Sequence, residues 1–566
     1  CQCTAGLGRP HRLKGTRIGL LHTSPSLAPR PENCVQQAGQ QESRQGSKRL
    51  MDAYQAASTL IVIIAATAWI LRPRKPPLRD AADATQWRIL ATTLNCAEQG
   101  SVQALLGEEQ KSSLEKWLPR GADMYAVAVQ ECGCWAELRR TVEAHLGSTY
   151  ALVSYEKIGE KRVRGRIAVA VFARKCDVDD GLVEEVSTKK MLMDVGSTGK
   201  GASTKGGVSI EVQVGGRSLC FLGAHLPADA GGRAQHTLRN ACAAALLGGD
   251  DFVKLQERCH VFFLGDLNYR AVPHDLTHAR DSTLKRVAYA SSKPSKTAWA
   301  AATRDDELIR DRRSGRALCG FREAPIYFAP TFRRVPGVAL PGREADAAAL
   351  CDAYTLFKSN EGAATVEEAL QLARRKRSPP AQAASAAGLR YPSWTDRVLV
   401  ASPPADDAAL ELLAYDAPEF PLQSDHRPAR LRCALLREPP AETYAGALRV
   451  TLEDLCFEPS SDDDAAELDR LVSGLVPDAP APALDTVSVS LGAATASAPW
   501  AARAVSVEAE RAPRHCVVAL ELGAALVALP ARDWSRRFRE PVVRFGRSRG
   551  VLSGRLRVEA SFSSGV

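Results

Sequence analysis

The segment that decides the fold is Val261-Phe262-Phe263-Leu264-Gly265-Asp266-Leu267-Asn268-Tyr269-Arg270, in which four apolar residues lead into polar ones. A short, fully apolar run bounded by glycine is typical of a buried strand. Polar groups at the end of a rigid strand are well placed for a preorganised site. The segment therefore predicts a buried strand that delivers Asp266 and Asn268 to a functional edge.

Further strand-like runs lie on both sides of this segment. Val208 and Ile210 alternate with Ser209 and Glu211, which is the period of a half-buried strand. Strands are predicted at 87–94, 125–129, 167–172, 208–214, 219–222 and 261–264, and helices at 108–118 and 365–375. This alternation predicts an α/β domain over residues 87–436.

Several of these runs end in polar residues of one chemical kind, and two late segments carry more: Asn95, Glu131, His225, Asp266, Asn268, Asp396, Asp425 and His426. Carboxylate and amide oxygens are hard ligands that suit Mg²⁺. Histidines can contact phosphate oxygens, and a carboxylate can orient an attacking water. Taken singly, Glu131 or Asn95 is more often a strand-end cap, and Asp396 beside Arg397 a surface ion pair. Together they predict hydrolysis of a phosphate ester.

Four motifs in order resemble the inositol polyphosphate 5-phosphatases. They are Gly265–Arg270 (the family's GDLNYR), Pro330–Arg333 (similar to P-T-Y-K), Pro392–Leu399 (similar to PAWCDRIL) and Ser424–Pro428 (SDH[RK]P). The resemblance covers about residues 85–435. It implies a four-layer α/β sandwich, in which two packed mixed β-sheets are flanked by helices. It also implies Mg²⁺-dependent removal of the 5-phosphate from a phosphoinositide lipid or a soluble inositol polyphosphate.

The resemblance assigns roles to particular residues. Glu131 would be the principal Mg²⁺ ligand, with Asn95 beside it and Asp425 near the metal. Asp266 would orient or deprotonate the nucleophilic water. Asn268 and His225 would contact the scissile phosphate, and His426, oriented by Asp396, would stabilise the charge that develops on it. Four side chains would bind the neighbouring phosphates of the head group: Tyr269, Arg270, Arg333 and Arg390.

The sequence departs from the family pattern at some positions. Thr204-Lys205-Gly206-Gly207 stands for Asn-Lys-Gly-Gly, and Arg333 replaces the usual lysine. The stretches 271–330 and 335–388 match poorly. Two alternatives stay open: a nuclease or sphingomyelinase of the same superfamily, or a catalytically weak membrane scaffold.

Charge and cysteine content exclude other classes. The chain has 566 residues and a net charge of +9, but residues 1–50 alone hold eight Lys or Arg against two Glu. The rest is only mildly basic, so no nucleic-acid partner is expected. Cys132 and Cys134 have no second pair with metal-chelate spacing, which favours reduced thiols over a zinc site.

The N-terminal region predicts a membrane anchor. Residues 1–50 are interpreted as a disordered leader or an extension of the gene model. Residues 53–71 carry no charge and would span about 28 Å as a helix, close to the hydrocarbon thickness. The basic, proline-rich linker 72–86 follows, which places the catalytic domain on the cytosolic side of an unidentified membrane.

The C-terminal region 445–566 has a different character. Alternating runs such as 448–452 and 516–522, separated by acidic and proline-rich stretches, predict a separate all-β sandwich. The domain is expected to bind lipid or protein. Asp462, Asp463 and Asp464 are interpreted as a solvated acidic loop rather than a calcium site.

Overall fold

The computed structural model divides the chain into two units, residues 1–79 and 80–566. It describes residues 85–159, 166–193, 205–229, 234–248, 255–271, 279–340, 347–355, 390–403, 406–437, 447–459, 486–491, 494–509, 515–520, 523–528, 534–544 and 547–561. The predicted leader, the anchor at 53–71, most of the linker and the helix at 365–375 lie outside these ranges. Among the described residues, no helix has the length and apolar character needed to cross a bilayer.

The first sheet, sheet I, is mixed and has six strands. Their order is β10 (Leu410–Asp416), β11 (Ala429–Leu436), β1 (Gln86–Asn95), β2 (Met124–Gln130), β4 (Ile167–Arg174) and β3 (Tyr150–Ile158). Strands β1 and β2 are parallel, and the other pairs are antiparallel. The parallel pair places the carboxyl ends of β1 and β2 at one edge.

The second sheet, sheet II, is also mixed and has five strands. Their order is β5 (Val183–Met193), β6 (Lys205–Val214), β7 (Arg217–His225), β8 (Cys259–Asp266) and β9 (Asp396–Ala401). Strands β7 and β8 are parallel. The predicted strand at 261–264 is therefore the interior strand β8, every residue of which is buried.

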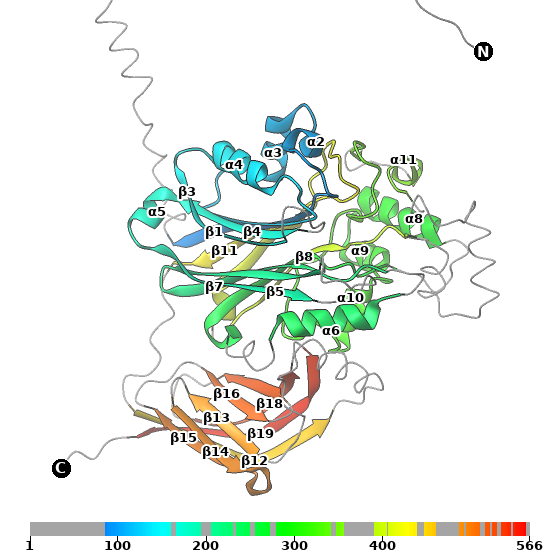
Figure 1. Ribbon diagram of the computed structural model, residues 1–566. Coiled ribbons are helices and arrows are strands. Elements are labelled where there is room, and N and C mark those ends of the chain that lie inside the picture. The colour runs from blue at the N-terminus through cyan, green and yellow to red at the C-terminus, as the bar shows by residue number, and fades with distance from the viewer. Residues whose placement is uncertain are drawn as a thin grey trace, which may run out of the picture. The chain divides into compact units, whose positions relative to one another are not determined.

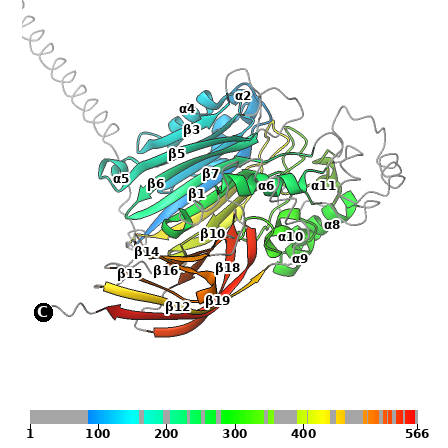
Figure 2. The same ribbon diagram turned by 60° about the horizontal axis from the view of Figure 1, so that its bottom comes forward.

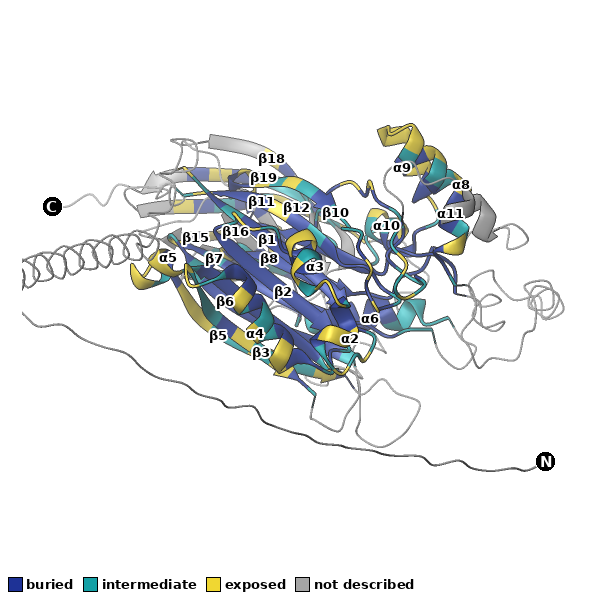
Figure 3. Cartoon of the chain, turned by 90° about the horizontal axis from the view of Figure 1, so that it is seen from above, coloured by how far each residue is buried: buried dark blue, intermediate teal, exposed yellow. Residues whose placement is uncertain are grey.

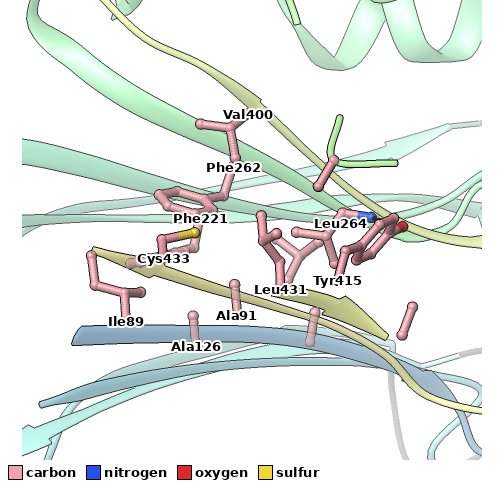
Figure 4. Close-up of a cluster of buried hydrophobic side chains, with 14 of the residues drawn as sticks. Ile89, Ala91, Ala126, Phe221, Phe262, Leu264, Val400, Tyr415, Leu431 and Cys433 are labelled. Atoms are coloured by element: carbon pink, nitrogen blue, oxygen red, sulfur yellow. Dashed lines mark hydrogen bonds between the residues drawn. The ribbon is translucent and has the colours of Figure 1, made fainter. Parts of the chain in front are cut away.

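The two sheets pack face to face over one hydrophobic core. Figure 4 shows side chains from both sheets meeting there, including Ile89, Ala91 and Leu431 from sheet I and Phe221, Phe262 and Val400 from sheet II. Gly223 of β7 lies in this layer, where an added Cβ would meet the Val169 side chain at 2.4 Å. The sheets can approach this closely because position 223 has no side chain.

Helices cover the outer faces. In Figure 1, α2 (Val102–Leu106), α3 (Gln110–Trp117) and α4 (Trp135–Leu146) lie over sheet I, and α6 (His236–Leu246) lies over sheet II. A separate apolar cluster underlies each cover. Figure 2 shows a further group beside the sandwich: α8 (Ala279–Ser292), α9 (Lys296–Ala302), α10 (Glu307–Arg313) and α11 (Ala347–Asp352). The short elements α5 (Lys175–Asp179) and η2 (Asp407–Ala409) complete this part of the chain.

A third, eight-stranded sheet, sheet III, is antiparallel throughout. Its order is β14 (Ala494–Pro499), β13 (Thr486–Leu491), β16 (His515–Leu520), β17 (Gly523–Ala528), β18 (Trp534–Arg544), β19 (Arg547–Ser561), β12 (Ala447–Pro459) and β15 (Val505–Ala509), with η3 at Trp500–Ala502. Its buried residues form a cluster of their own. The prediction of two mixed sheets with an additional all-β region is therefore confirmed, while the exact domain boundaries stay predictions.

Candidate active site

The strand ends singled out in the sequence meet at one edge of the sandwich. The parallel register sets Asn95 beside Gln130 in sheet I and His225 beside Asp266 in sheet II. Figure 3 shows that the strands β1, β2, β7 and β8 leading to this edge are buried along most of their length. The site is thus built on rigid elements from both sheets.

A cavity of about 180 Å³ opens at this edge. Its lining is Asn95, Glu131, Lys205, His225, Ala228, Asp229, Asp266, Asn268, Arg270, Phe332, Arg333, Arg390, Asp425 and His426. Ten of the twelve predicted site residues are in this lining. Backbone conformation helps to aim two of them, since Glu131 and Asn268 have φ angles of 48° and 57°. These left-handed conformations are uncommon for residues with a side chain.

Asp266 lies at the centre of the contacts. Asn95 Nδ2 donates to its Oδ2 at 2.9 Å, which joins sheet I to sheet II. His225 Nε2 is 3.4 Å and His426 Nε2 is 3.8 Å from the same oxygen. Burial raises the pKa of Asp266, but His426, His225 and Lys205 outweigh burial and hold this pKa well below its ordinary value. Asp266 is therefore an ionised carboxylate with cationic or polar neighbours on three sides.

His426 and Asp396 form a buried pair. His426 Nδ1 is 2.9 Å from Asp396 Oδ2, and Thr395 Oγ1 donates to the same carboxylate oxygen at 3.0 Å. Burial opposes the charged imidazolium, but Asp396 and Asp266 outweigh it and raise the pKa of His426 to about 10. Burial also raises the pKa of Asp396, against the effect of His426. The pair fixes the imidazole so that Nε2 faces the cavity side.

Lys205 brings a further cation that the sequence analysis did not assign. Its Nζ bonds to His225 Nε2, and His225 Nε2 lies 3.7 Å from Glu131 Oε1. Burial lowers the pKa of Lys205, while Glu131 and Asp266 oppose that shift. The sequence signal was present, because Lys205 belongs to the Thr-Lys-Gly-Gly segment that was noted only as a departure.

Two groups of side chains have the chemistry of a metal site. Ligand atoms of Asp266, Asp396 and His426 lie within 4.8 Å of one another. His426, however, uses Nδ1 for Asp396 and is held protonated, so this group fits proton handling better than metal binding. Glu131, Asn95 and Asp425 offer oxygen ligands to the same cavity. Hard oxygen ligands with both carboxylates partly exposed are the donor set that suits Mg²⁺.

The predicted phosphate-binding side chains divide into two groups. Arg270, Arg333 and Arg390 line the cavity. Arg333 Nε also donates to Asp425 Oδ2 at 3.2 Å. Tyr269 is instead fully buried outside the cavity lining, and its hydroxyl donates to Asn240 Oδ1 at 2.7 Å. Asp396 likewise lies behind His426, as expected for a residue that orients it.

Comparison with known proteins finds a matching family model and several similar curated proteins. Residues 92–341 match the model of the Endonuclease/Exonuclease/phosphatase family 2. Type I inositol polyphosphate 5-phosphatase 5 of Arabidopsis thaliana is 26% identical over 299 residues, which cover 50% of this chain and 44% of the relative. Phosphatidylinositol 4,5-bisphosphate 5-phosphatase A of Homo sapiens is 26% identical over 225 residues, which cover 38% of this chain and 20% of the relative.

Among solved structures, the inositol polyphosphate 5-phosphatase domain of SPsynaptojanin is similar at 18% identity and a TM-score of 0.40, covering 69% of this chain and 90% of that one. The fold described above rests on this chain's own strand pairing. The chain spans less than half the length of the two curated relatives. Residues 92–341 are thus similar to the Endonuclease/Exonuclease/phosphatase family 2, and the similar curated proteins are named as inositol polyphosphate or phosphoinositide 5-phosphatases.

Proposed function

We propose that this chain hydrolyses the 5-phosphate of phosphoinositide lipids or of soluble inositol polyphosphates, in a Mg²⁺-dependent reaction. The proposal rests on the residues that line one cavity. Asp266 and His426 line it together with four basic side chains: Lys205, Arg270, Arg333 and Arg390. Such a cavity suits a small polyanion with one phosphate at the reacting groups and others beside it.

In the proposed reaction, a water oxygen attacks phosphorus and the bond from phosphorus to the inositol oxygen breaks. Ionised Asp266 orients the water and accepts a hydrogen bond from it. His426, protonated and held by Asp396, donates from Nε2 to a phosphoryl oxygen on which charge develops. Lys205 Nζ bonds to His225 Nε2, and that nitrogen lies 3.4 Å from Asp266 Oδ2, so these two side chains add hydrogen-bonding groups beside the carboxylate.

Glu131, Asn95 and Asp425 are the residues proposed to hold Mg²⁺. When bound, the ion supplies positive charge to the phosphoryl oxygens. Asn95 also keeps its hydrogen bond to Asp266, so the proposed ion site and the water-orienting carboxylate are directly linked.

Hydrolysis of a panel of substrates tests the function, with inorganic phosphate measured for the inositol compounds, phosphocholine for sphingomyelin and strand cleavage for DNA. The panel contains vesicles with phosphatidylinositol 4,5-bisphosphate or 3,4,5-trisphosphate, soluble inositol polyphosphates, sphingomyelin and DNA. Release from the inositol compounds with Mg²⁺ supports the proposal. Activity confined to DNA or sphingomyelin would indicate another branch of the superfamily, and no activity on any substrate would indicate a scaffold.

We further propose that residues 53–71 hold the chain at a membrane, with the catalytic region in the cytosol. The support is the uncharged sequence and the basic flank that follows it. Deleting residues 1–72 should move the protein to the soluble fraction and spare hydrolysis of soluble inositol phosphates. A deletion variant that stays with membranes through a carbonate wash contradicts the anchor.

A further inference from the structure

The guanidinium of Arg270 reaches the cavity with two donors unused. Only 4% of the residue is exposed. Its Nη2 donates to Asn268 Oδ1 at 2.6 Å, and its Cζ lies 4.8 Å from the centre of the Phe332 ring. Nε and Nη1 have no hydrogen-bond partner among the described residues. A buried arginine with unpaired donors is costly, which points to an anionic ligand at these two nitrogens.

The backbone of Arg270 is held at two points by Glu307. The Arg270 N–H donates to Glu307 Oε2 at 2.8 Å, and the Glu307 N–H donates to the Arg270 carbonyl at 2.9 Å. Glu307 is itself buried, with 3% exposure. This two-point contact sets the direction in which the Arg270 side chain leaves the chain.

Arg239 connects Glu307 to Asp229, a residue that lines the cavity. Arg239 Nη2 donates to Glu307 Oε2 at 2.8 Å, and its Nη1 donates to Asp229 Oδ1 at 2.7 Å. Arg239 is fully buried on α6. The carbonyl of Asp229 in turn accepts from Arg390 Nη2 at 3.4 Å. Asp229, Arg239 and Glu307 thus form an ionic relay that touches both Arg270 and Arg390.

We propose that Glu307 and Arg239 are positioning residues, and that this relay fixes Arg270 for binding a phosphate next to the one that is cleaved. The inference rests on the proposed function for the identity of the ligand. It gives a role to the region of α10, which carries none of the four motifs. The proposal also accounts for the acidic Asp229 in the lining of a cavity that would bind an anion, because Asp229 forms an ion pair with Arg239.

The segment just before helix α10 offers a matched control. Asp305 lies two residues before Glu307 and makes an equally short ion pair, 2.6 Å from Arg286. Among the described residues, the ion pairs of Asp305 are with Arg286 and Arg304, and neither of these arginines lines the cavity. Asp305→Asn therefore removes a comparable interaction in the same region without touching the relay.

The first experiment separates KM from kcat on a soluble inositol polyphosphate with a phosphate beside the scissile one. Glu307→Gln keeps the shape but removes the charge facing Arg239. We expect KM to rise roughly tenfold, with kcat changed by less than about twofold, because uniform binding is lost. In an Arg270→Gln background, Glu307→Gln should add no further increase, since both act on one contact. Asp305→Asn should match the wild type.

The proposed role of Glu307 would be wrong if Glu307→Gln had the KM of the wild type. It would also be wrong if the KM increases of Glu307→Gln and Arg270→Gln multiplied in the double variant. Thermal unfolding checks that each variant is folded. If Glu307→Gln does not fold, Arg239→Lys gives the same test, because lysine keeps the charge but has one nitrogen in place of the two that contact Asp229 and Glu307. Binding of the same inositol polyphosphate by calorimetry in EDTA separates this inference from the proposed function. A wild type that binds but never releases phosphate defeats the proposed function alone. The relay is then judged by Kd, which should rise roughly tenfold in Glu307→Gln and stay constant in Asp305→Asn.

Discussion

At the scale of single residues, the site depends on Asp266, whose carboxylate is contacted from both sheets. Asn95 bonds to it from β1 and His225 approaches it from β7. The carboxylate is ionised because its cationic neighbours outweigh burial. Its removal should affect chemistry far more than stability, since the neighbouring histidines and Asn95 are left with space that water can fill.

Asp266→Ala should lower kcat by about 10²–10⁴, the usual cost of losing a general base or water-orienting group. The measurement is phosphate release by a variant with wild-type circular dichroism. Asp416→Asn is the control, because Asp416 bonds to Arg430 at the surface. A folded Asp266→Ala protein with near-normal turnover would refute the role of Asp266.

Glu131→Ala should abolish most turnover and should also remove any effect of Mg²⁺ on thermal stability. EDTA should stop the wild-type reaction and Mg²⁺ should restore it. The thermal shift is informative because it does not depend on turnover: a ligand that binds only the folded state raises the unfolding temperature. An unchanged Mg²⁺-induced shift in Glu131→Ala would exclude Glu131 as a ligand.

The sequence motifs predict most of the residues that line the cavity. Asp266, His225, Asn268 and His426 were predicted, and the structure brings them into one cavity. Other contributors to the site, Lys205, Asp229, Arg239 and Glu307, were not assigned a role. The motif segment that contains Lys205 was visible in the sequence, but Glu307 contacts Arg239 across 68 residues, and no local pattern encodes such a contact.

At the scale of elements, strands with a strong apolar period were predicted closely. The runs at 87–94, 125–129 and 261–264 became β1, β2 and β8. Strands β3, β5, β10 and β11 were not predicted. They lie at or near sheet edges, where mixed exposure weakens the alternation; β5, for example, is exposed at most of its positions. The order of the strands in the sheets could not be derived from the sequence either. In sheet I, for example, β1 pairs with β11, which lies more than 300 residues later in the chain.

Gly223→Val should destabilise the fold by about 1–3 kcal/mol, the usual cost of overpacking a core. A side chain there would clash with Val169 of β4 and crowd Ala128 of β2. The measurement is the urea midpoint of unfolding. Gly100→Ala is the control, because nothing lies within 4 Å of an added Cβ at that position. Equal midpoints for the two variants would contradict the close packing of the sheets.

A second prediction at this scale concerns acid stability. Burial raises the pKa of Asp406, but His260 and Arg217 outweigh burial and lower it. A carboxylate with a depressed pKa stabilises the fold above its unfolded pKa, and that stabilisation is lost as the pH falls through the folded value. Asp406→Asn should therefore reduce the unfolding free energy at pH 7 and flatten its decline below about pH 4. A parallel decline in both proteins would show that Asp406 contributes nothing to acid stability.

At the scale of the whole molecule, sheet III buries its own cluster, and every described member of it, such as Val450, Val518 and Leu556, lies on strands β12–β19. Among the residues that the structure describes, the three apolar clusters of sheets I and II contain none beyond Leu435. A chain ending at residue 437 should therefore keep its cooperative unfolding and its kcat on soluble inositol phosphates. Loss of cooperative unfolding on this truncation would show that the sheets stabilise one another.

The bond between Asn95 and Asp266 also has a consequence for protein synthesis. Its partners are 171 residues apart, and β1, which carries Asn95, is completed on one side by β11 at residues 429–436. A nascent chain on the ribosome therefore cannot assemble the reacting groups until nearly the entire catalytic region has been translated. If the proposed function holds, the emerging polypeptide should therefore not hydrolyse phosphate esters until β11 has paired with β1.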